Sequence, residues 1–322
     1  MYPLRFEPLL KQYLWGGRRL GTVLNKPIGD GDDYAESWEV VDHESGQSVV
    51  CNGELAGKTL KELLVEHGPE LLGRHHPVDR FPLLFKFLDA NRQLSVQVHP
   101  DDAGAARLSP PDLGKTEAWV IMSAEPGSYI YAGLKRGFDR PALEREVARQ
   151  TTELCLHKVH PQAGDCIFIP AGTVHAIGPG LVVAEIQQAS NTTFRLFDWN
   201  RVGKDGQSRE LHIEQALDAI DYGRGPVDPR KPVQLEAGCE QLVACEKFVL
   251  NRWQLTDSKA IGAPDTFQIL AVLDGAMTLE EDGPSSGDPV GKGQTILVPA
   301  ACSPIKVAAA APNTTVLQMH LP

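Results

Sequence analysis

Long apolar runs are absent from this sequence. No segment approaches 18 consecutive apolar residues, the length that a membrane-spanning helix requires. The stretch MYPLRFEPLLKQYLWGG has neither the uninterrupted apolar segment nor the small-residue cleavage site of a signal peptide. The six cysteines are scattered and include no C-x-x-C pair, which favours reduced thiols over a disulfide framework. We therefore expect a cytoplasmic protein that has no membrane span.

A long basic stretch is missing as well. The net charge is −11, which argues against nucleic acid as the main ligand. An anionic substrate would therefore need a local cluster of Lys and Arg. With 42% hydrophobic and 23% charged residues, the 322-residue chain has the profile of a globular protein with one large domain or two ordinary ones.

Strand signals dominate what is present. They are segments rich in β-branched and aromatic residues, separated by Gly, Pro, Asp and Asn. In chain order they are ESWEVV, FPLLFKFL, LSVQVH, EAWVIM, SYIYAGL, CLHKVH, DCIFIP, LVVAEIQQ and TFRLFDW. Helical spacing is confined to KTLKELLVEHGPELL with Thr59 as N-cap, DRPALEREVARQ with Asp139 and Pro141 at its start, and HIEQALDAI.

An internal sequence repeat suggests a duplicated β unit. AGDCIFIPAGTVH (163–175) aligns without gaps on KGQTILVPAACSP (292–304), and His175 falls opposite Pro304. The segment 222–232 between them is dense in Gly and Pro and is the best linker candidate. Duplication with one degenerate copy explains the repeat most simply, and it places the chemistry on the N-terminal side.

Four residues have the character of one metal site: Gln97, His99, Glu117 and His175. Two imidazoles, one carboxylate and an amide oxygen suit a divalent ion of borderline softness, zinc first. On a strand Gln97 and His99 share one face, as does Ser95. A single carboxylate leaves the dication about one unit positive, so that it can act as a Lewis acid. The alternative is that Gln-x-His is an ordinary polar pair, since sequence distance cannot show that the four converge.

Cations lie near these segments. They are Lys86 in an otherwise apolar strand, Lys115 on the same face as Glu117, and Arg195 and Arg201 in and after TFRLF. Each could be an edge residue with its charge in water, but together on one barrel they would favour an anionic ligand such as a phosphate. Glu185 is an acid in an apolar strand, with either a structural role beside an Arg such as Arg195 or a catalytic one.

The ordered motifs resemble a known family, the type I mannose-6-phosphate isomerases in their short bacterial form. The matching stretches are YLWGGRRL, ESWEVVDH, FPLLFKFLDA, LSVQVHPDD, GKTEAW, FIPAGTVHAIG and EIQQASNTTFRLFDWNR. This resemblance implies a mainly β fold of two cupin-type, jelly-roll-like β-barrel domains with a few short helices. We expect a catalytic domain with the metal site at 1–226 and a second domain without one at 227–322.

The same resemblance implies roles for individual residues. Gln97, His99, Glu117 and His175 would bind one zinc ion per chain. Arg195, Lys115 and Glu185 would line the catalytic pocket, and Lys86, Ser95 and Arg201 would bind the substrate phosphate. The base is left open among Lys115, Glu185 and a metal-bound water.

The implied reaction is the interconversion of mannose 6-phosphate and fructose 6-phosphate through a cis-enediol(ate). Alternatives are an isomerase of another hexose phosphate and a non-catalytic cupin sensor of sugar phosphates. An Fe(II) cupin dioxygenase is disfavoured because such an enzyme would not need Gln97 or the phosphate-type cations. The expected partner is a small sugar phosphate, with neither nucleic acid nor a membrane involved, and the sequence leaves the oligomeric state open.

Overall fold

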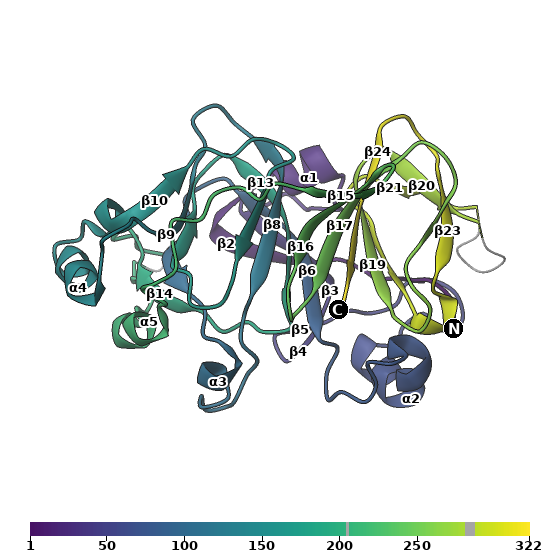
Figure 1. The fold of residues 1–322 in the computed structure, drawn as a ribbon, viewed down its shortest axis with the longest axis horizontal. Coiled ribbons are helices and arrows are strands. Elements are labelled where there is room, and N and C mark those ends of the chain that lie inside the picture. Colours follow the sequence, from purple (N-terminus) through teal and green to yellow (C-terminus); the bar gives the residue numbers. More distant parts are fainter. Residues whose placement is uncertain (204–205, 281–286) are drawn as a thin grey trace.

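The computed structural model describes residues 1–203, 206–280 and 287–322. Within these ranges the chain is mainly β, with twenty-four strands and five α-helices. The mainly β prediction with a few helices is therefore confirmed. Figure 1 shows the N-terminal strands on one side of the molecule and the C-terminal strands, coloured green to yellow, on the other.

Two sheets form the N-terminal half. The six-stranded sheet has the order β11 (Cys166–Ile169), β8 (Glu117–Ala124), β13 (Leu181–Gln188), β6 (Leu83–Ala90), β3 (Tyr34–Val40) and β2 (Leu9–Gly17). The five-stranded sheet has the order β10 (Leu156–Val159), β9 (Ile130–Leu134), β12 (His175–Ile177), β7 (Val96–Val98) and β14 (Phe194–Phe197). Their facing sides share an apolar cluster that includes Trp119, Ile121 and Ile177.

Two further sheets form the C-terminal half. The seven-stranded sheet has the order β1 (Leu4–Arg5), β22 (Thr295–Val298), β19 (Gln268–Asp274), β24 (Thr314–His320), β17 (Val249–Leu255), β16 (Cys239–Ala244) and β15 (Val233–Glu236). The four-stranded sheet has the order β18 (Lys259–Ile261), β23 (Ile305–Ala309), β20 (Ala276–Leu279) and β21 (Val290–Gly291). A small ladder of β4 (Asp42–His43) and β5 (Gly46–Gln47) lies apart from them.

The six- and seven-stranded sheets share the largest core, so the two halves are packed together. Phe85 and Phe87 on β6 belong to the same buried cluster as Ile269 on β19 and Leu317 on β24. Because side chains alternate along a strand, Lys86 between the two phenylalanines faces the other way, towards the five-stranded sheet. All eight residues of β6 are buried, so the polar Lys86 lies in an enclosed layer.

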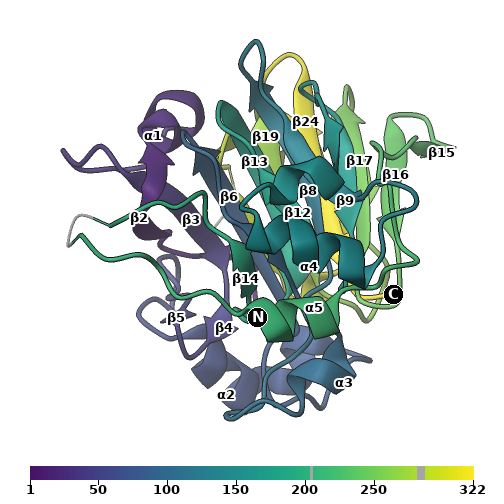
Figure 2. The ribbon, with the colours of Figure 1, turned by 90° about the vertical axis from the view of Figure 1, so that its left-hand side faces the viewer.

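The helices begin and end at sequence signals. They are α1 (Arg19–Leu24), α2 (Leu60–Leu72), α3 (Asp102–Ala105), α4 (Arg140–Ala148) and α5 (Ile213–Ala219), with 3-10 turns at Thr152–Cys155 and Ala300–Cys302. Thr59 caps α2 in a reciprocal capping box with Glu62, and Asp139 caps α4 ahead of its early proline. These three predicted helices (α2, α4 and α5) are confirmed. Figure 2 shows α4 and α5 on the outer side of the five-stranded sheet.

The two repeat segments, 163–175 and 292–304, occupy equivalent places in the two halves. The Gly164 N–H bonds to the carbonyl of Ile121, while the Ile121 N–H bonds to the carbonyl of Asp165. Gly293, Val272 and Gln294 repeat this pair of bonds in the seven-stranded sheet. Both glycines have positive φ values (93° and 80°), which favour glycine. The two predicted repeat segments therefore make the same pair of backbone hydrogen bonds.

Every predicted strand is present, and the structure adds further strands that were not predicted, among them β1, β2, β4, β5 and β12. β2 and β12 lie in segments without an alternating pattern, and β12 is only three residues long. The predicted linker 222–232 contains no helix or strand. No helix in the described ranges is both long and apolar enough to cross a membrane. Cys51, Cys155, Cys166, Cys239 and Cys245 are free thiols.

Candidate metal centre and active-site pocket

Strand register brings three predicted site residues into one row across the five-stranded sheet. His175 on β12 is the Cα partner of Gln97 on β7, and Gln97 is in turn the partner of Arg195 on β14. Each pair is antiparallel, so directly opposite side chains lie on the same face. His99 follows the end of β7 by one residue, where Pro100 comes next.

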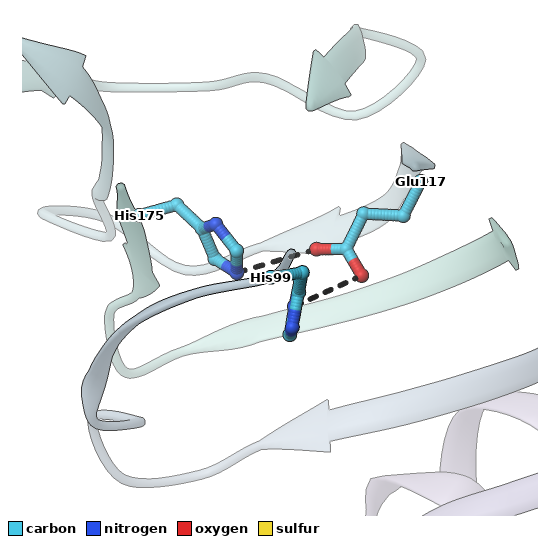
Figure 3. A group of neighbouring side chains, drawn as sticks. All are labelled: His99, Glu117 and His175. Atoms are coloured by element: carbon cyan, nitrogen blue, oxygen red, sulfur yellow. Dashed lines mark ion pairs between the residues drawn. The ribbon is translucent and has the colours of Figure 1, made fainter. Parts of the chain in front are cut away.

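Glu117 reaches the same point from the facing sheet, at the first residue of β8. Figure 3 shows its carboxylate with one imidazole at each oxygen. His175 Nε2 lies 3.3 Å from Oε1 of Glu117, and His99 Nε2 lies 3.5 Å from Oε2. Their ligand atoms all lie within 4.8 Å of one another, and all three side chains are buried. Glu117 Oε1 has no hydrogen-bond partner among the described residues.

Backbone carbonyls fix the tautomer of both histidines. His99 Nδ1 lies 2.9 Å from the carbonyl oxygen of Thr192, and His175 Nδ1 lies 2.9 Å from that of Thr173. A carbonyl oxygen only accepts, so each Nδ1 carries the proton and each Nε2 presents a lone pair. Metal-binding histidines are oriented by this kind of bond to the second ring nitrogen.

Electrostatics keeps the cluster in the protonation state that a metal requires. Burial, helped by the charge of Lys115, lowers the pKa of His99 to about 4. Burial also lowers the pKa of His175. For Glu117, burial alone would raise the pKa, but Lys115, His99 and His175 together outweigh it and the pKa is lowered. Two neutral imidazoles beside one carboxylate therefore exist at neutral pH, and these donors fit a divalent ion.

Gln97 lies at the edge of this cluster. Its Nε2 is 3.3 Å from His175 Nε2, and its Oε1 accepts a hydrogen bond of 3.2 Å from Ser95 Oγ. The amide carries both a donor and an acceptor, so Gln97 is able to serve as a neutral oxygen ligand. The structure thus brings all four predicted ligands together.

A second row crosses the six-stranded sheet. Glu185 on β13 has Trp119 on β8 and Lys86 on β6 as its Cα partners. Lys86 Nζ lies 3.1 Å from Glu185 Oε1, and Trp119 Nε1 donates to Oε2 at 2.9 Å. Burial alone would lower the pKa of Lys86, but the negative charges of Glu185 and Glu36 outweigh it and raise the pKa. Lys86, not Arg195, is therefore the close partner of Glu185, because register places it directly opposite.

Lys115 connects the two rows. Its Nζ forms an ion pair with Glu117 Oε2, lies 3.1 Å from His99 Nε2 and lies 3.6 Å from Glu185 Oε1. The predicted shared orientation of Lys115 and Glu117 is thus confirmed. The two rows enclose a pocket of about 290 Å³, whose lining includes Lys86, Ser95, Gln97, Lys115, Trp119, Glu185, Arg195 and Arg209.

Comparison with known proteins agrees with this arrangement. Residues 4–129 match the family model for the catalytic domain of type I phosphomannose isomerase. Mannose-6-phosphate isomerase ManA of Bacillus subtilis is 35% identical over 95% of this chain and 95% of its own length. The chain belongs to the type I mannose-6-phosphate isomerase family. It is accordingly an enzyme of the isomerase class.

Two further relatives extend the family match. A mannose-6-phosphate isomerase of Streptococcus mutans is 37% identical over 85% of each chain. The crystal structure of the mannose 6-phosphate isomerase from Bacillus subtilis superposes with a TM-score of 0.90 at 30% identity and covers all of both chains. The family resemblance predicted from the sequence motifs is therefore confirmed.

One predicted residue lies apart from the isomerase pocket. Arg201 lines a different cavity with Arg92 and Val202. Its guanidinium is bound to the carboxylate of Asp198 and to the carbonyl oxygen of Gln93. Strand β14 ends at Phe197, and the chain then turns through positive φ at Trp199 and Asn200 (58° and 54°). The alternation of side chains along β14 therefore no longer decides which way Arg201 faces.

Other residues of the site carried no pattern that sequence reasoning used. Asp112 accepts hydrogen bonds from Ser190 Oγ (2.9 Å), Thr192 Oγ1 (2.8 Å) and Arg80 (3.0 Å). It thereby holds the segment whose Thr192 carbonyl orients His99. Tyr13 and Trp15 line the pocket with stacked rings 5.7 Å apart. Only the YLWGG motif pointed to these two rings.

Proposed function

We propose that this isomerase interconverts mannose 6-phosphate and fructose 6-phosphate through a cis-enediol(ate). The observation that carries the proposal is the pair of neutral imidazoles whose Nε2 atoms face one carboxylate at 3.3 and 3.5 Å. The relatives' names add the substrate, since two of them are called mannose-6-phosphate isomerases.

We propose one zinc ion per chain, held by Gln97, His99, Glu117 and His175. When bound, the ion would supply a Lewis acid that polarises substrate oxygens. The donor set supports this proposal because it contains two nitrogens and one anionic oxygen within 4.8 Å, a combination that zinc accepts. The fixed Nδ1 tautomers support it further.

Lys115 would transfer the proton between C2 and C1. Its Nζ lies 3.1 Å from His99 Nε2, and it lines the pocket where the reacting carbons must lie; as a neutral amine it would take the proton from one carbon and return it to the other. Glu185 has both oxygens engaged, by Trp119 on one side and by Lys86 and Lys115 on the other. We therefore assign Glu185 the task of positioning Lys115.

Arg195 would stabilise negative charge that develops on the enediolate. Its Nη1 donates to the carbonyl of Glu210 at 2.8 Å, and its Nε is buried without a partner among the described residues. Lys86 and Ser95 would contact the substrate phosphate from inside the pocket, where both lie. Arg201 stays a prediction as a phosphate ligand, and its present bonds engage it elsewhere.

We also propose that the chain is built of two cupin-type domains, at 1–226 and 227–322. The matched hydrogen bonds at Gly164 and Gly293 support a common ancestry of the two β units. In the second unit Pro304 stands opposite His175, so that unit would have no metal site. β1 belongs to the seven-stranded sheet through its pairing with β22, so the first residues of the chain join the C-terminal unit.

The test follows the conversion of mannose 6-phosphate by the purified protein, before chelation, after it, and after zinc is returned. We expect activity to disappear with chelation and to recover with zinc. Glucose 6-phosphate serves as the control substrate for hexose-phosphate specificity. A folded, zinc-loaded sample that converts no mannose 6-phosphate would overturn the proposal, and conversion of another hexose phosphate would then favour the alternative isomerase.

A further inference from the structure

Two arginines bind one carboxylate beside the pocket, with Arg195 nearby. Arg209 donates to Asp198 through Nε (2.9 Å) and Nη2 (2.5 Å), a bidentate contact. Arg201 binds the same carboxylate from another side. Burial is the main reason that the pKa of Arg195 is lowered. The positive charges of Arg209 and Arg201 lower it further, whereas the negative charge of Asp198 opposes them. Asp198 itself is buried.

The arginines at Asp198 differ in where they face. Arg209 lines the active-site pocket together with Gln97, Lys115 and Arg195. Arg201 lines the cavity with Arg92 and Val202 instead. Asp198 therefore contacts two guanidinium groups, of which that of Arg209 lines the active-site pocket.

The charge balance of the pocket is uneven. Lys86 forms ion pairs with Glu36 and Glu185, and Lys115 forms ion pairs with Glu117 and Glu185. Among the described residues, Arg201 and Arg209 share one buried carboxylate, that of Asp198. Glu210 adds a negative charge nearby, but its side chain is 83% exposed, so water screens it. Two guanidinium groups thus share a single carboxylate here, whereas three carboxylates surround the two lysines.

From the place of Arg209 in the pocket lining and its contact with Asp198, we propose that Arg209 is a ligand of the substrate phosphate, held in place by Asp198. This inference rests on the proposed isomerase function and extends it, because neither the sequence motifs nor the resemblance assigned Arg209 a role. A phosphate group carries up to two negative charges, for which a guanidinium group is a suitable partner. A guanidinium pinned on one edge by a carboxylate keeps its other edge preorganised for a bidentate oxyanion contact.

The same reasoning orients the substrate. The phosphate would lie at Arg209, while the carbonyl end of the open sugar would lie beside Gln97 and Lys115, where Arg195 can reach the enediolate. Lys86 is less suited to bind the phosphate alone, since its charge is already engaged by Glu185 at 3.1 Å and Glu36 at 3.5 Å. Arg209 therefore supplies a positive charge that the sequence-based assignment lacks.

The first experiment measures the binding of inorganic phosphate to the metal-loaded protein by calorimetry. We expect Arg209→Gln to weaken phosphate binding by about 10- to 100-fold, the range for loss of a charged hydrogen-bonding group. The variant should also raise the KM for mannose 6-phosphate much more than it lowers kcat. Arg149→Gln is the matched control, because Arg149, at the end of α4, is 68% exposed and forms an ion pair with Glu146 outside the pocket.

Arg201→Gln is the decisive comparison, since it removes a guanidinium from the same carboxylate but from the other cavity. A larger loss in Arg209→Gln than in Arg201→Gln supports the proposal. An equal or larger loss in Arg201→Gln overturns it, because the effect would then come from the Asp198 cluster as a whole or from Arg201. If Arg209→Gln does not fold, Arg209→Lys keeps the charge but loses the bidentate guanidinium contact, so it should bind phosphate less tightly than Arg201→Gln does.

Failure of this inference and failure of the proposed function give different results. If the wild-type protein converts mannose 6-phosphate but Arg209→Gln binds phosphate equally well, the function stands and the role of Arg209 is refuted. If the wild-type protein binds phosphate in an Arg209-dependent way but converts no mannose 6-phosphate, the anion site stands and the isomerase activity is refuted.

Discussion

Gln97 and His175 are direct partners across the β7–β12 ladder, with their Nε2 atoms 3.3 Å apart. They come from segments 78 residues apart in the chain. The ladder fixes the separation of the two side chains, and the carbonyls of Thr173 and Thr192 fix the two imidazole rings. The proposed metal site is therefore largely built by backbone hydrogen bonds before any ion binds.

The first prediction concerns the ligand set. His175→Ala removes one nitrogen donor, and we expect zinc affinity to fall by more than about 100-fold, since even partners outside the ligand set cost 10–100-fold. Zinc content after dialysis against a competing chelator, measured with activity, checks this. His157→Ala is the control, because His157 pairs with Asp228 outside the cluster. Full zinc content in His175→Ala would remove His175 from the proposed site.

The second prediction concerns Asp112 and pH. Burial alone would raise the pKa of Asp112, but hydrogen bonds from His43, Thr192 and Ser190 outweigh it and lower the pKa. A lowered pKa in the folded state means that the carboxylate contributes stability above the usual Asp range near pH 4, and loses it as the pH falls. Asp112→Asn should therefore cost about 2 kcal/mol at pH 7 and progressively less on acidification.

Denaturant unfolding of wild type and Asp112→Asn between pH 7 and pH 3 measures this difference. Asp32→Asn provides the baseline, since the Asp32 side chain is 91% exposed and its ion pair with Arg18 is long at 3.8 Å. A gap between wild type and Asp112→Asn that stays constant across this range would show that the charge of Asp112 is not what stabilises the fold.

Much of the site could be predicted because its signals lie in single residues. Gln97, His99, Glu117 and His175 have side chains that are unusual in strands. The chemistry of these side chains alone suggested that they bind one ion. The alternation of a strand also predicted that Lys115 and Glu117 share a face. The alternation of side chains along a strand could not predict the register, that is, which residues of neighbouring strands lie opposite each other. Only the observed pairing shows that Glu185 lies opposite Lys86.

Other parts lacked any signal in the side chains. The carbonyls of Thr173 and Thr192 act through the backbone, which every residue has, so no residue type marks them. Arg209 lies outside all described strands and helices, so periodicity gave no direction for its side chain. Arg201 was predicted in the pocket from its place in a motif, but the turn at Trp199 and Asn200 decides which cavity it faces.

The third prediction concerns the thiols. Burial raises the pKa of Cys166 to about 12 and of Cys155 and Cys239 to about 11. These thiols should therefore resist alkylation in the native protein at pH 8, since the thiolate is the reactive form. Cys51 is exposed and should react first. Peptide mapping after brief iodoacetamide treatment checks the order, and labelling of Cys166 before Cys51 would contradict the buried β11 position.

The last prediction separates Lys115 from Glu185 in catalysis. If Lys115 transfers the proton, Lys115→Gln should lower kcat by about 10²- to 10⁴-fold, the usual contribution of a general acid or base. Glu185→Gln keeps the side-chain shape and can still accept from Trp119, so we expect a smaller loss, of about tenfold, with an altered pH profile. Zinc content is measured for both, because Lys115 contacts Glu117 and His99.

Isotope exchange gives the sharper readout for these two variants. Mannose 6-phosphate labelled with deuterium at C2 loses the label to water when the proton-transfer group exchanges with solvent during turnover. Lys115→Gln at full zinc content should abolish this loss, whereas Glu185→Gln should only slow it, because Glu185 acts through Lys115 at 3.6 Å. The reverse pattern, with label loss retained in Lys115→Gln and abolished in Glu185→Gln, would make Glu185 the proton-transfer group and Lys115 its electrostatic partner.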